Sequence, residues 1–101
     1  MTFINFTPHA IVLNDGTQFK SNGIARVANT FSEIEDGVCS VEYGQIENLP
    51  APQEGVRYIV SAMVLSAAKA AGRTDCVAPA TGHPACVRKD GFIVSVPCFV
   101  R

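Results

Sequence analysis

The feature that most constrains this chain is one segment, Val56–Gly72, in which signals for a strand, a helix start, a helix and a helix stop follow one another. Val56–Val60 is an apolar run of the length expected for a buried strand. Ser61 is a residue type that caps helices, and Gly72 stands where a helix-ending glycine belongs. The segment therefore predicts a strand followed by a helix over Ala62–Ala71.

The side chains of this helix are unusually small, with Lys69 as its only charge and five alanines: Ala62, Ala67, Ala68, Ala70 and Ala71. A helix with so narrow a polar stripe is expected to be covered on two sides. One side must face its own sheet, and the other would face a neighbouring subunit. Only 17% of the residues are charged, below the roughly 25% of typical soluble chains. Both features predict a self-associating protein, although a dense core would also explain the low charge.

The rest of the chain alternates short β-forming runs with turns. Phe3–Leu13 is interrupted by Pro8, which predicts an edge strand, a bulge or two short strands. Ala28–Gly37 is expected to be a loop that could hold one helical turn. Further strands are expected at Thr17–Lys20, Ile24–Val27, Val38–Ile46, Cys76–Pro79, Ala85–Arg88 and Phe92–Val100. We therefore predict one α+β domain over residues 1–101, with a mainly antiparallel sheet of about six strands and one or two helices packed on it.

The net charge of −1 argues against a protein that binds DNA or RNA polymers through a basic face. The charge is unevenly spread, however. Residues 1–55 hold two cations and seven acids, a net −5, whereas residues 56–101 hold six cations and two acids, a net +4. The basic half could hold a small anion such as phosphate, or it could pair with the acidic half within the fold.

The sequence contains neither a signal-peptide pattern nor an apolar run long enough to span a membrane. We expect a cytoplasmic protein that does not associate with membranes. Its cysteines, Cys39, Cys76, Cys86 and Cys98, are then expected to be reduced thiols.

The chain shows no recognisable catalytic or metal-binding pattern. The cysteines lie 37, 10 and 12 residues apart, without the tight local pairs typical of zinc sites, so no metal or cofactor is expected. Cys86 could in principle pair with His83 or His9, but it lies in an apolar strand where a thiol is inert. The sequence thus favours a protein that is not an enzyme.

A few polar and aromatic residues are candidates for ligand binding. Arginine suits phosphate because its planar fork bonds two oxygens at once. Each candidate also has an ordinary structural explanation; Arg73, for example, could simply pair with Asp75. The free amides that follow Ser61 could likewise hold a phosphate, or Ser61 could only cap its helix. A phosphate-and-ring binding set would comprise the cations Arg26, Arg73, Arg88 and Lys89 together with Tyr58, Thr81 and Gly82.

A series of short motifs, in a fixed order over nearly the whole chain, resembles a family of phage proteins. The motifs are Ile4-Asn5-Phe6-Thr7-Pro8-His9, Gly23-Ile24-Ala25-Arg26-Val27, Tyr43-Gly44, Leu49-Pro50-Ala51-Pro52, Gly55-Val56-Arg57-Tyr58-Ile59-Val60-Ser61, Gly72-Arg73-Thr74-Asp75 and Pro79-Ala80-Thr81-Gly82. They are similar to the first class of Thoeris anti-defence proteins. Members of that family sequester cyclic ADP-ribose isomers made by bacterial TIR-domain enzymes.

The resemblance implies a sponge that binds a cyclic nucleotide without cleaving it, in the cytoplasm of an infected bacterium. It also implies a homo-oligomer, from dimer to hexamer, that holds the signal at subunit interfaces; some members hold cyclic trinucleotides at a separate site on a symmetry axis. Arg26 and Thr81 would serve an oligonucleotide-type site. The dinucleotide-like signal would be held by Tyr58, Arg73, Arg88 and Arg101.

Two alternatives remain open from the sequence. One is a phage enzyme that degrades such signals, for which His9, His83 and Asp75 are the candidate acid–base groups. The other is a phage interaction or assembly protein with no small ligand, which a pocket without basic residues would favour.

Overall fold

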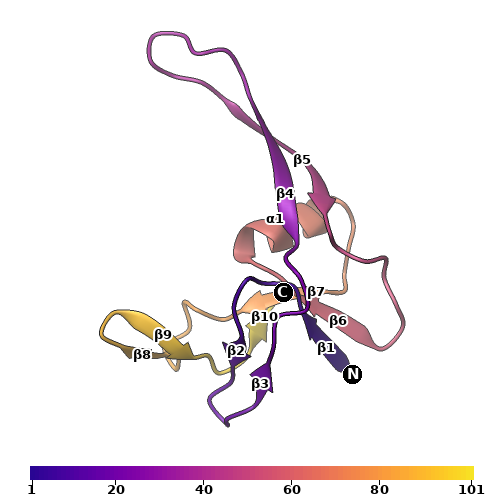
Figure 1. Ribbon diagram of the computed structural model, residues 1–101, viewed down its shortest axis with the longest axis vertical. Helices are drawn as coiled ribbons and strands as arrows, with labels where there is room; N and C mark the ends of the chain where they lie inside the picture. Colours follow the sequence, from indigo (N-terminus) through magenta and orange to yellow (C-terminus); the bar gives the residue numbers. More distant parts are fainter.

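The centre of the molecule is a four-stranded sheet in the order β1–β6–β7–β10 (Figure 1). The structure, a computed structural model, describes all residues 1–101. In this sheet β1 pairs in parallel with β6, β6 pairs in parallel with β7, and β7 pairs antiparallel with β10. The four strands are β1 (Thr2–Asn5), β6 (Val56–Ile59), β7 (Cys76–Pro79) and β10 (Phe99–Val100).

The helix α1 (Ala62–Ala70) connects β6 to β7 and makes a β–α–β unit. The hydroxyl of Ser61 accepts a hydrogen bond from the Val64 amide at 3.3 Å and caps the helix. At the other end Gly72 takes φ 85°, and the Arg73 amide donates to the Ala68 carbonyl at 2.8 Å. This is the glycine-ended stop that orphan carbonyls at a helix end require. The predicted cap, helix and stop are confirmed.

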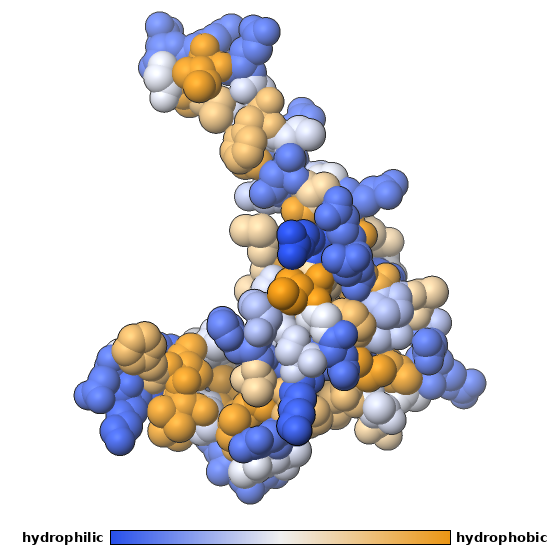
Figure 2. Space-filling model, viewed as in Figure 1, coloured by the Kyte–Doolittle hydropathy of each residue, from blue (hydrophilic) through white to orange (hydrophobic).

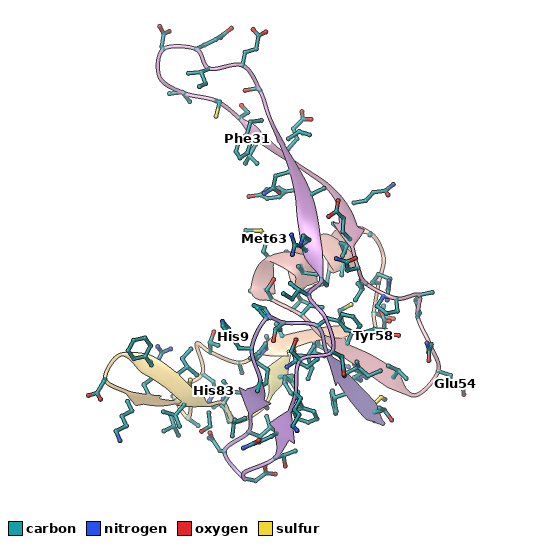
Figure 3. All side chains as sticks on the ribbon, viewed as in Figure 1. His9, Phe31, Glu54, Tyr58, Met63 and His83 are labelled. Carbon is teal, nitrogen blue, oxygen red and sulfur yellow. The ribbon has the colours of Figure 1, made fainter.

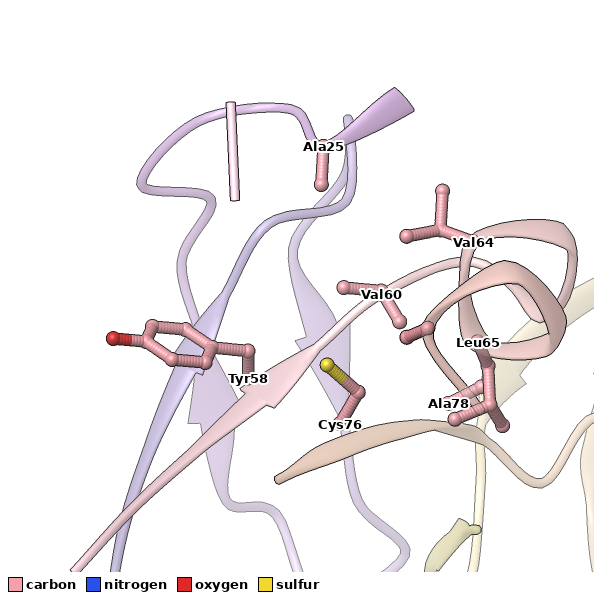
Figure 4. Close-up of a cluster of buried hydrophobic side chains, with 8 residues drawn as sticks. Ala25, Tyr58, Val60, Val64, Leu65, Cys76 and Ala78 are labelled. Carbon is pink, nitrogen blue, oxygen red and sulfur yellow. The ribbon is translucent and has the colours of Figure 1, made fainter. Parts of the chain in front are cut away.

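The main core lies between α1 and the sheet (Figure 4). Ala68 is fully buried, and its small side chain lets the helix backbone lie close to the strands. The opposite face of the sheet is covered by the rings of Phe3, Phe19 and Phe99, whose centroids lie 5.2–5.8 Å apart. The core against α1 consists of Ala25, Tyr58, Val60, Val64, Leu65, Ala68, Cys76 and Ala78.

Three antiparallel hairpins surround this centre. The hairpin β4 (Arg26–Phe31)–β5 (Val41–Glu47) projects far beyond the sheet, and we call it the long arm. The hairpin β8 (Val87–Lys89)–β9 (Phe92–Ser95) projects in another direction (Figure 1), and we call it the short arm. The third is β2 (Ile11–Val12)–β3 (Gln18–Phe19). The radius of gyration of 15.4 Å exceeds the about 12.7 Å of a compact chain of this length.

The predicted α+β class, with one helix and mainly antiparallel strands, is confirmed, but there are ten short strands rather than six. The loop expected over Ala28–Gly37 is confirmed for residues 32–37 but wrong for residues 28–31, which belong to β4, and no helical turn forms there. Phe92–Val100 is not one strand, because the chain leaves the ladder around Pro97, which has no amide proton to donate. Phe3–Leu13 forms two short strands, one of the expected alternatives.

The helix α1 has nine residues, and the structure contains no helix with the length and apolar character needed to cross a bilayer.

Candidate functional site

The candidate site lies at the edge of the sheet where β1 and β7 end. Because β1, β6 and β7 are parallel, their carboxyl ends meet on one side of the molecule. In open sheets of this kind ligands bind outside the carboxyl ends of the strands. A cavity of about 290 Å³ opens there, between the segment after β1, the end of β7 and strand β9 of the short arm. Its lining residues are His9, Ala10, Ile11, Val12, Pro79, Thr81, Ile93, Val94, Ser95 and Val96.

Asn5, at the end of β1, fixes the segment that forms one wall of this cavity. Its side-chain amide nitrogen donates to the carbonyls of His9 at 2.8 Å and Phe19 at 2.9 Å. Its side-chain oxygen accepts the Thr7 amide at 2.8 Å and lies 2.6 Å from the Thr7 hydroxyl. Asn5 is only 1% exposed, so this network satisfies a polar group that would otherwise be buried alone.

Sequence reasoning missed this positioning role of Asn5. The signal available was an asparagine two residues before a threonine and three before a proline, a pattern typical of a local turn built on a side chain. The turn carries His9 to the cavity while using the His9 carbonyl as an anchor.

A second network closes the opposite wall, between β2 and the short arm. The Ser95 hydroxyl donates to the Asn14 side-chain oxygen at 2.6 Å, and the Asn14 side-chain nitrogen donates to the Ala85 carbonyl at 2.9 Å. The amide of Val96 donates to the Val12 carbonyl at 2.9 Å. These bonds join segments that are about 80 residues apart. Since its proton is used in this network, the Ser95 hydroxyl is not activated as a nucleophile.

Two of the six sequence-predicted binding residues meet at the rim of the cavity. Thr81 follows β7 and lines the cavity with an exposed side chain, and the Arg88 guanidinium donates a hydrogen bond to the Thr81 carbonyl. A guanidinium carries five N–H donors, and this bond is the only protein hydrogen bond that the Arg88 side chain makes. The remaining donors are therefore free to bond an anion.

The guanidinium of Arg73 is bonded within the fold and lies apart from the cavity. Its Nε and Nη2 donate to the two carboxylate oxygens of Asp75, each at 2.8 Å, and Nη2 also donates to the Pro50 carbonyl at 2.9 Å. The hydrogen bonds from Arg73 hold the pKa of the Asp75 carboxyl below its ordinary value, and they raise the pKa of Arg73. The pair lies at the amino end of β7, away from Thr81, and Asp75 is equally unavailable as a catalytic acid.

Tyr58 is buried in the core and is not exposed as a stacking platform for a ligand. The residue is 1% exposed, and its ring packs edge-on against Phe6 with centroids 5.7 Å apart. Its hydroxyl donates to the Ala51 carbonyl at 3.2 Å. Figure 4 shows the ring within the core, with the hydroxyl pointing away from Cys76 and Val60. An aromatic residue in a strand fills a core more often than it faces a ligand.

Arg26 and Arg101 are exposed but lie apart from the cavity. Arg26 begins β4 and pairs in register with Glu47 at the base of the long arm. Arg101 follows β10, which runs antiparallel to β7 with Val100 opposite Ala78, so the chain end lies toward the start of β7 rather than toward Thr81. The six predicted residues therefore do not form one site within a single chain.

His83 and the Cys86 thiol are not hydrogen-bonded to each other. The His83 Nδ1 accepts the Ala85 amide at 3.0 Å, and the Cys86 thiol donates to the Ser95 carbonyl at 3.5 Å. Each group is thus bonded to backbone rather than to the other. No group of three or more His, Cys, Asp or Glu side chains is close enough together to share a metal ion.

Comparison of the chain with models of known protein families, with curated proteins and with solved structures finds no match to any of them.

Proposed function

We propose that this protein binds a small cyclic nucleotide at the Thr81–Arg88 rim and retains it without cleaving it. The ligand class comes from the motif resemblance to the phage anti-defence sponges, which bind cyclic ADP-ribose isomers and cyclic oligonucleotides. The observation that supports it is the cavity at the carboxyl ends of β1 and β7, which joins an apolar lining to a guanidinium with free donors.

The chemistry of the lining suits the two parts of a nucleotide. The side chains of Ile11, Val12 and Ile93 offer apolar contact for a base or a sugar ring. The free N–H donors of Arg88 and the exposed hydroxyl of Thr81 stand at the rim, where they can bond phosphate oxygens. A guanidinium is preferred over an amine at such a place because it bonds two oxygens in one plane.

Retention rather than turnover is supported by the commitments of the polar groups around the cavity. Acid–base cleavage requires a group whose proton is free to move to or from the reacting atom. The Ser95 hydroxyl donates a hydrogen bond to the Asn14 side-chain oxygen, and His83 Nδ1 accepts one from the Ala85 amide. His9 is exposed at the cavity and is the group on which the alternative, a degrading enzyme, would depend.

A second candidate function is favoured by a specific observation. None of the four main surface hollows is lined by an arginine or lysine side chain. A phage interaction or assembly protein with no small ligand would need no cation there. In the sponge proposal the cation reaches the ligand from the rim, and neighbouring copies in the oligomer that the resemblance implies supply the others, with Arg26 and Arg101 exposed for that role.

The experiment is a retention assay on the purified protein. The protein is incubated with cyclic ADP-ribose isomers and cyclic oligonucleotides, freed of unbound ligand, heated, and the released compounds are identified by mass. Intact ligand is the expected result. Release of a cleaved product would contradict the proposal and favour the degrading enzyme. If the His9→Ala variant then released intact ligand, the cleavage would be assigned to His9. Release of nothing would contradict both and favour the assembly protein.

A further inference from the structure

Asn22, in the connection between β3 and β4, stands directly before a glycine, Gly23. None of the other four asparagines of the chain precedes a glycine. A glycine carries no Cβ, so its backbone nitrogen can approach the side-chain carbonyl carbon of the asparagine before it. That approach is the first step of deamidation, the reaction that makes asparagine a heat-sensitive residue in proteins.

The reacting groups of this pair are not held by the fold. Asn22 is exposed, and neither residue belongs to a helix or a strand. The Asn22 side chain makes no hydrogen bond within the protein, and the Gly23 amide donates to no backbone carbonyl. The side chains of Asn5 and Asn14, by contrast, are each fixed by hydrogen bonds to carbonyls of other segments. Asn22 is therefore free to turn its side chain toward the Gly23 nitrogen.

Water reaches both residues of the pair. They lie in the wall of a hollow of about 550 Å³, which is lined by Phe6, Asn22, Gly23, Ile24, Asn48, Leu49 and Pro50. In the view of Figure 3 the connection rises from β3 to the foot of the long arm, between the labelled His9 and Tyr58. The surface at the foot of the long arm is a mixture of polar and apolar atoms in Figure 2, not one apolar patch. The hollow is thus accessible to the water molecule that the reaction consumes.

The glycine cannot be exchanged for a larger residue without a clash. A Cβ at position 23 would lie 3.0 Å from Phe6 Cε1 and 3.2 Å from Phe6 Cδ1. The Phe6 ring is itself held in place, since it packs against Tyr58 with ring centroids 5.7 Å apart. The fold therefore keeps a glycine at this position and, with it, the reactive pair.

We propose that Asn22 is a site of spontaneous covalent modification, in which its side-chain amide is lost. The Gly23 nitrogen bonds to the side-chain carbonyl carbon of Asn22, the bond from that carbon to the amide nitrogen breaks, and ammonia leaves with the Gly23 proton. One water molecule then opens the resulting succinimide ring. Opening at the side-chain carbonyl gives aspartate, and opening at the backbone carbonyl gives isoaspartate, in which the chain runs through the former side chain. This inference does not depend on the ligand proposed for the Thr81–Arg88 rim.

The isoaspartate product would change the backbone at a place where it is fixed on both sides. The Asn22 amide donates to the Asn5 carbonyl at 2.8 Å, and the Ala25 amide donates to the Phe6 carbonyl at 2.9 Å. Isoaspartate inserts one extra backbone carbon between these two hydrogen bonds, and Ala25 is buried in the core at 6% exposure. The fold can accommodate that carbon only by losing one of the bonds or by moving Ala25, so the isoaspartyl chain should be less stable.

The first test follows the mass of one tryptic peptide. The purified protein is incubated at mildly alkaline pH and digested with trypsin at intervals, and a sample digested at the start corrects for conversion during digestion. Cleavage after Lys20 and Arg26 releases residues 21–26, in which Asn22 is the only asparagine. We expect this peptide to gain the mass difference between an amide and an acid. The gain should be at least about tenfold faster than at Asn29 and Asn48, which are exposed but precede threonine and leucine.

Two results of this test would overturn the proposal. One is a peptide of residues 21–26 that keeps its mass throughout the incubation. The other is conversion of Asn22 at the same rate as Asn29 or Asn48, which would mean that neither Gly23 nor the free side chain makes this asparagine reactive.

The second test separates the effect of the longer backbone from that of the new charge. Asn22→Asp carries the charge on an unchanged backbone, so it is the matched control for the deamidated protein, which ion exchange separates from the unmodified chain. In urea denaturation Asn22→Asp should unfold at the same midpoint as wild type. The isoaspartyl protein, identified by fragmentation of the peptide 21–26, should unfold at a lower urea concentration. Equal midpoints for the isoaspartyl protein and Asn22→Asp would contradict the predicted loss of the bonds to the Asn5 and Phe6 carbonyls.

Discussion

Arg73 and Asp75 face each other across two hydrogen bonds of 2.8 Å, and the same guanidinium holds the Pro50 carbonyl at 2.9 Å. This is the only ion pair in the structure, and both side chains are largely buried, at 19% and 14% exposed. One arginine thus ties the proline-rich connection before β6 to the start of β7, two segments 23 residues apart. The role of this arginine is structural.

Arg73→Ala is expected to destabilise the fold by about 1–3 kcal/mol, because it leaves the Asp75 carboxylate and the Pro50 carbonyl without their donor. Urea denaturation followed by circular dichroism measures the difference. Arg101→Ala, at an exposed and unpaired position, is the control and should stay within about 0.5 kcal/mol of wild type. Equal stability of the two variants would refute the anchoring role of Arg73.

The Asp75 carboxyl should make the free energy of unfolding depend on pH in the acid range. Its folded pKa is lowered by the hydrogen bonds from Arg73, so its contribution is fully present above the ordinary unfolded value of about 3.9 and is lost as pH falls through the lower folded pKa. The stability gap between wild type and Asp75→Asn should therefore be largest near neutral pH and shrink below pH of about 4. A gap that is constant with pH would contradict the linkage.

Asn5→Ala is expected to destabilise the fold more than the removal of one small side chain would suggest. It would leave the Phe19 carbonyl and the Thr7 amide without the partner that the buried side chain now provides, whereas the His9 carbonyl keeps its bond from the Thr7 hydroxyl. Each unsatisfied buried group costs about 1–3 kcal/mol, so the free energy of unfolding should fall by about 2 kcal/mol or more. Asn22→Ala, an exposed asparagine nearby, should be close to neutral in the same denaturation measurement.

The exposed and the buried cysteines should react at very different rates. Cys39 and Cys98 are exposed, whereas burial of Cys76 raises the pKa of its thiol to about 11. Because the thiolate is the reactive form, Ellman's reagent should modify Cys39 and Cys98 quickly at pH 8 and Cys76 only after unfolding. Peptide mapping of the labelled protein assigns each site. Rapid labelling of Cys76 in the folded protein would contradict the placement of β7 in the core.

Local signals in the sequence were sufficient to predict the secondary structure of the segment from β6 to β7. Ser61, Gly72 and the apolar run between Val56 and Val60 each act within a few residues, so the strand, cap, helix and stop could be predicted. In the long arm, most of β5 and the start of β4 were predicted. The continuation of β4 was not, because Asn29 and Thr30 are polar and become strand only by pairing with Tyr43 and Glu42.

The candidate site was likewise predictable from the sequence only in part. Thr81 and Arg88 were identified by residue type, but their meeting depends on the fold between β7 and the short arm. Pairing of Arg73 with Asp75 was one of the alternatives open from the sequence, but the bond from Arg73 to the Pro50 carbonyl spans 23 residues and had no local signal. For Tyr58, strand alternation alone did not show which face of the strand is buried. Parallel pairing of β1, β6 and β7, which creates the cavity edge, has no local sequence signal.

The most direct test of the proposed binding site is a calorimetric titration of cyclic ADP-ribose isomers and cyclic oligonucleotides into wild type, Arg88→Ala and Lys89→Ala. Both residues are exposed cations of the short arm, but only Arg88 is bonded to Thr81 at the cavity rim. Loss of one charge-assisted phosphate contact should weaken binding of the bound ligand at least about tenfold in Arg88→Ala, with Lys89→Ala within about twofold of wild type. Equal affinities in the two variants, or no binding by wild type, would contradict the account.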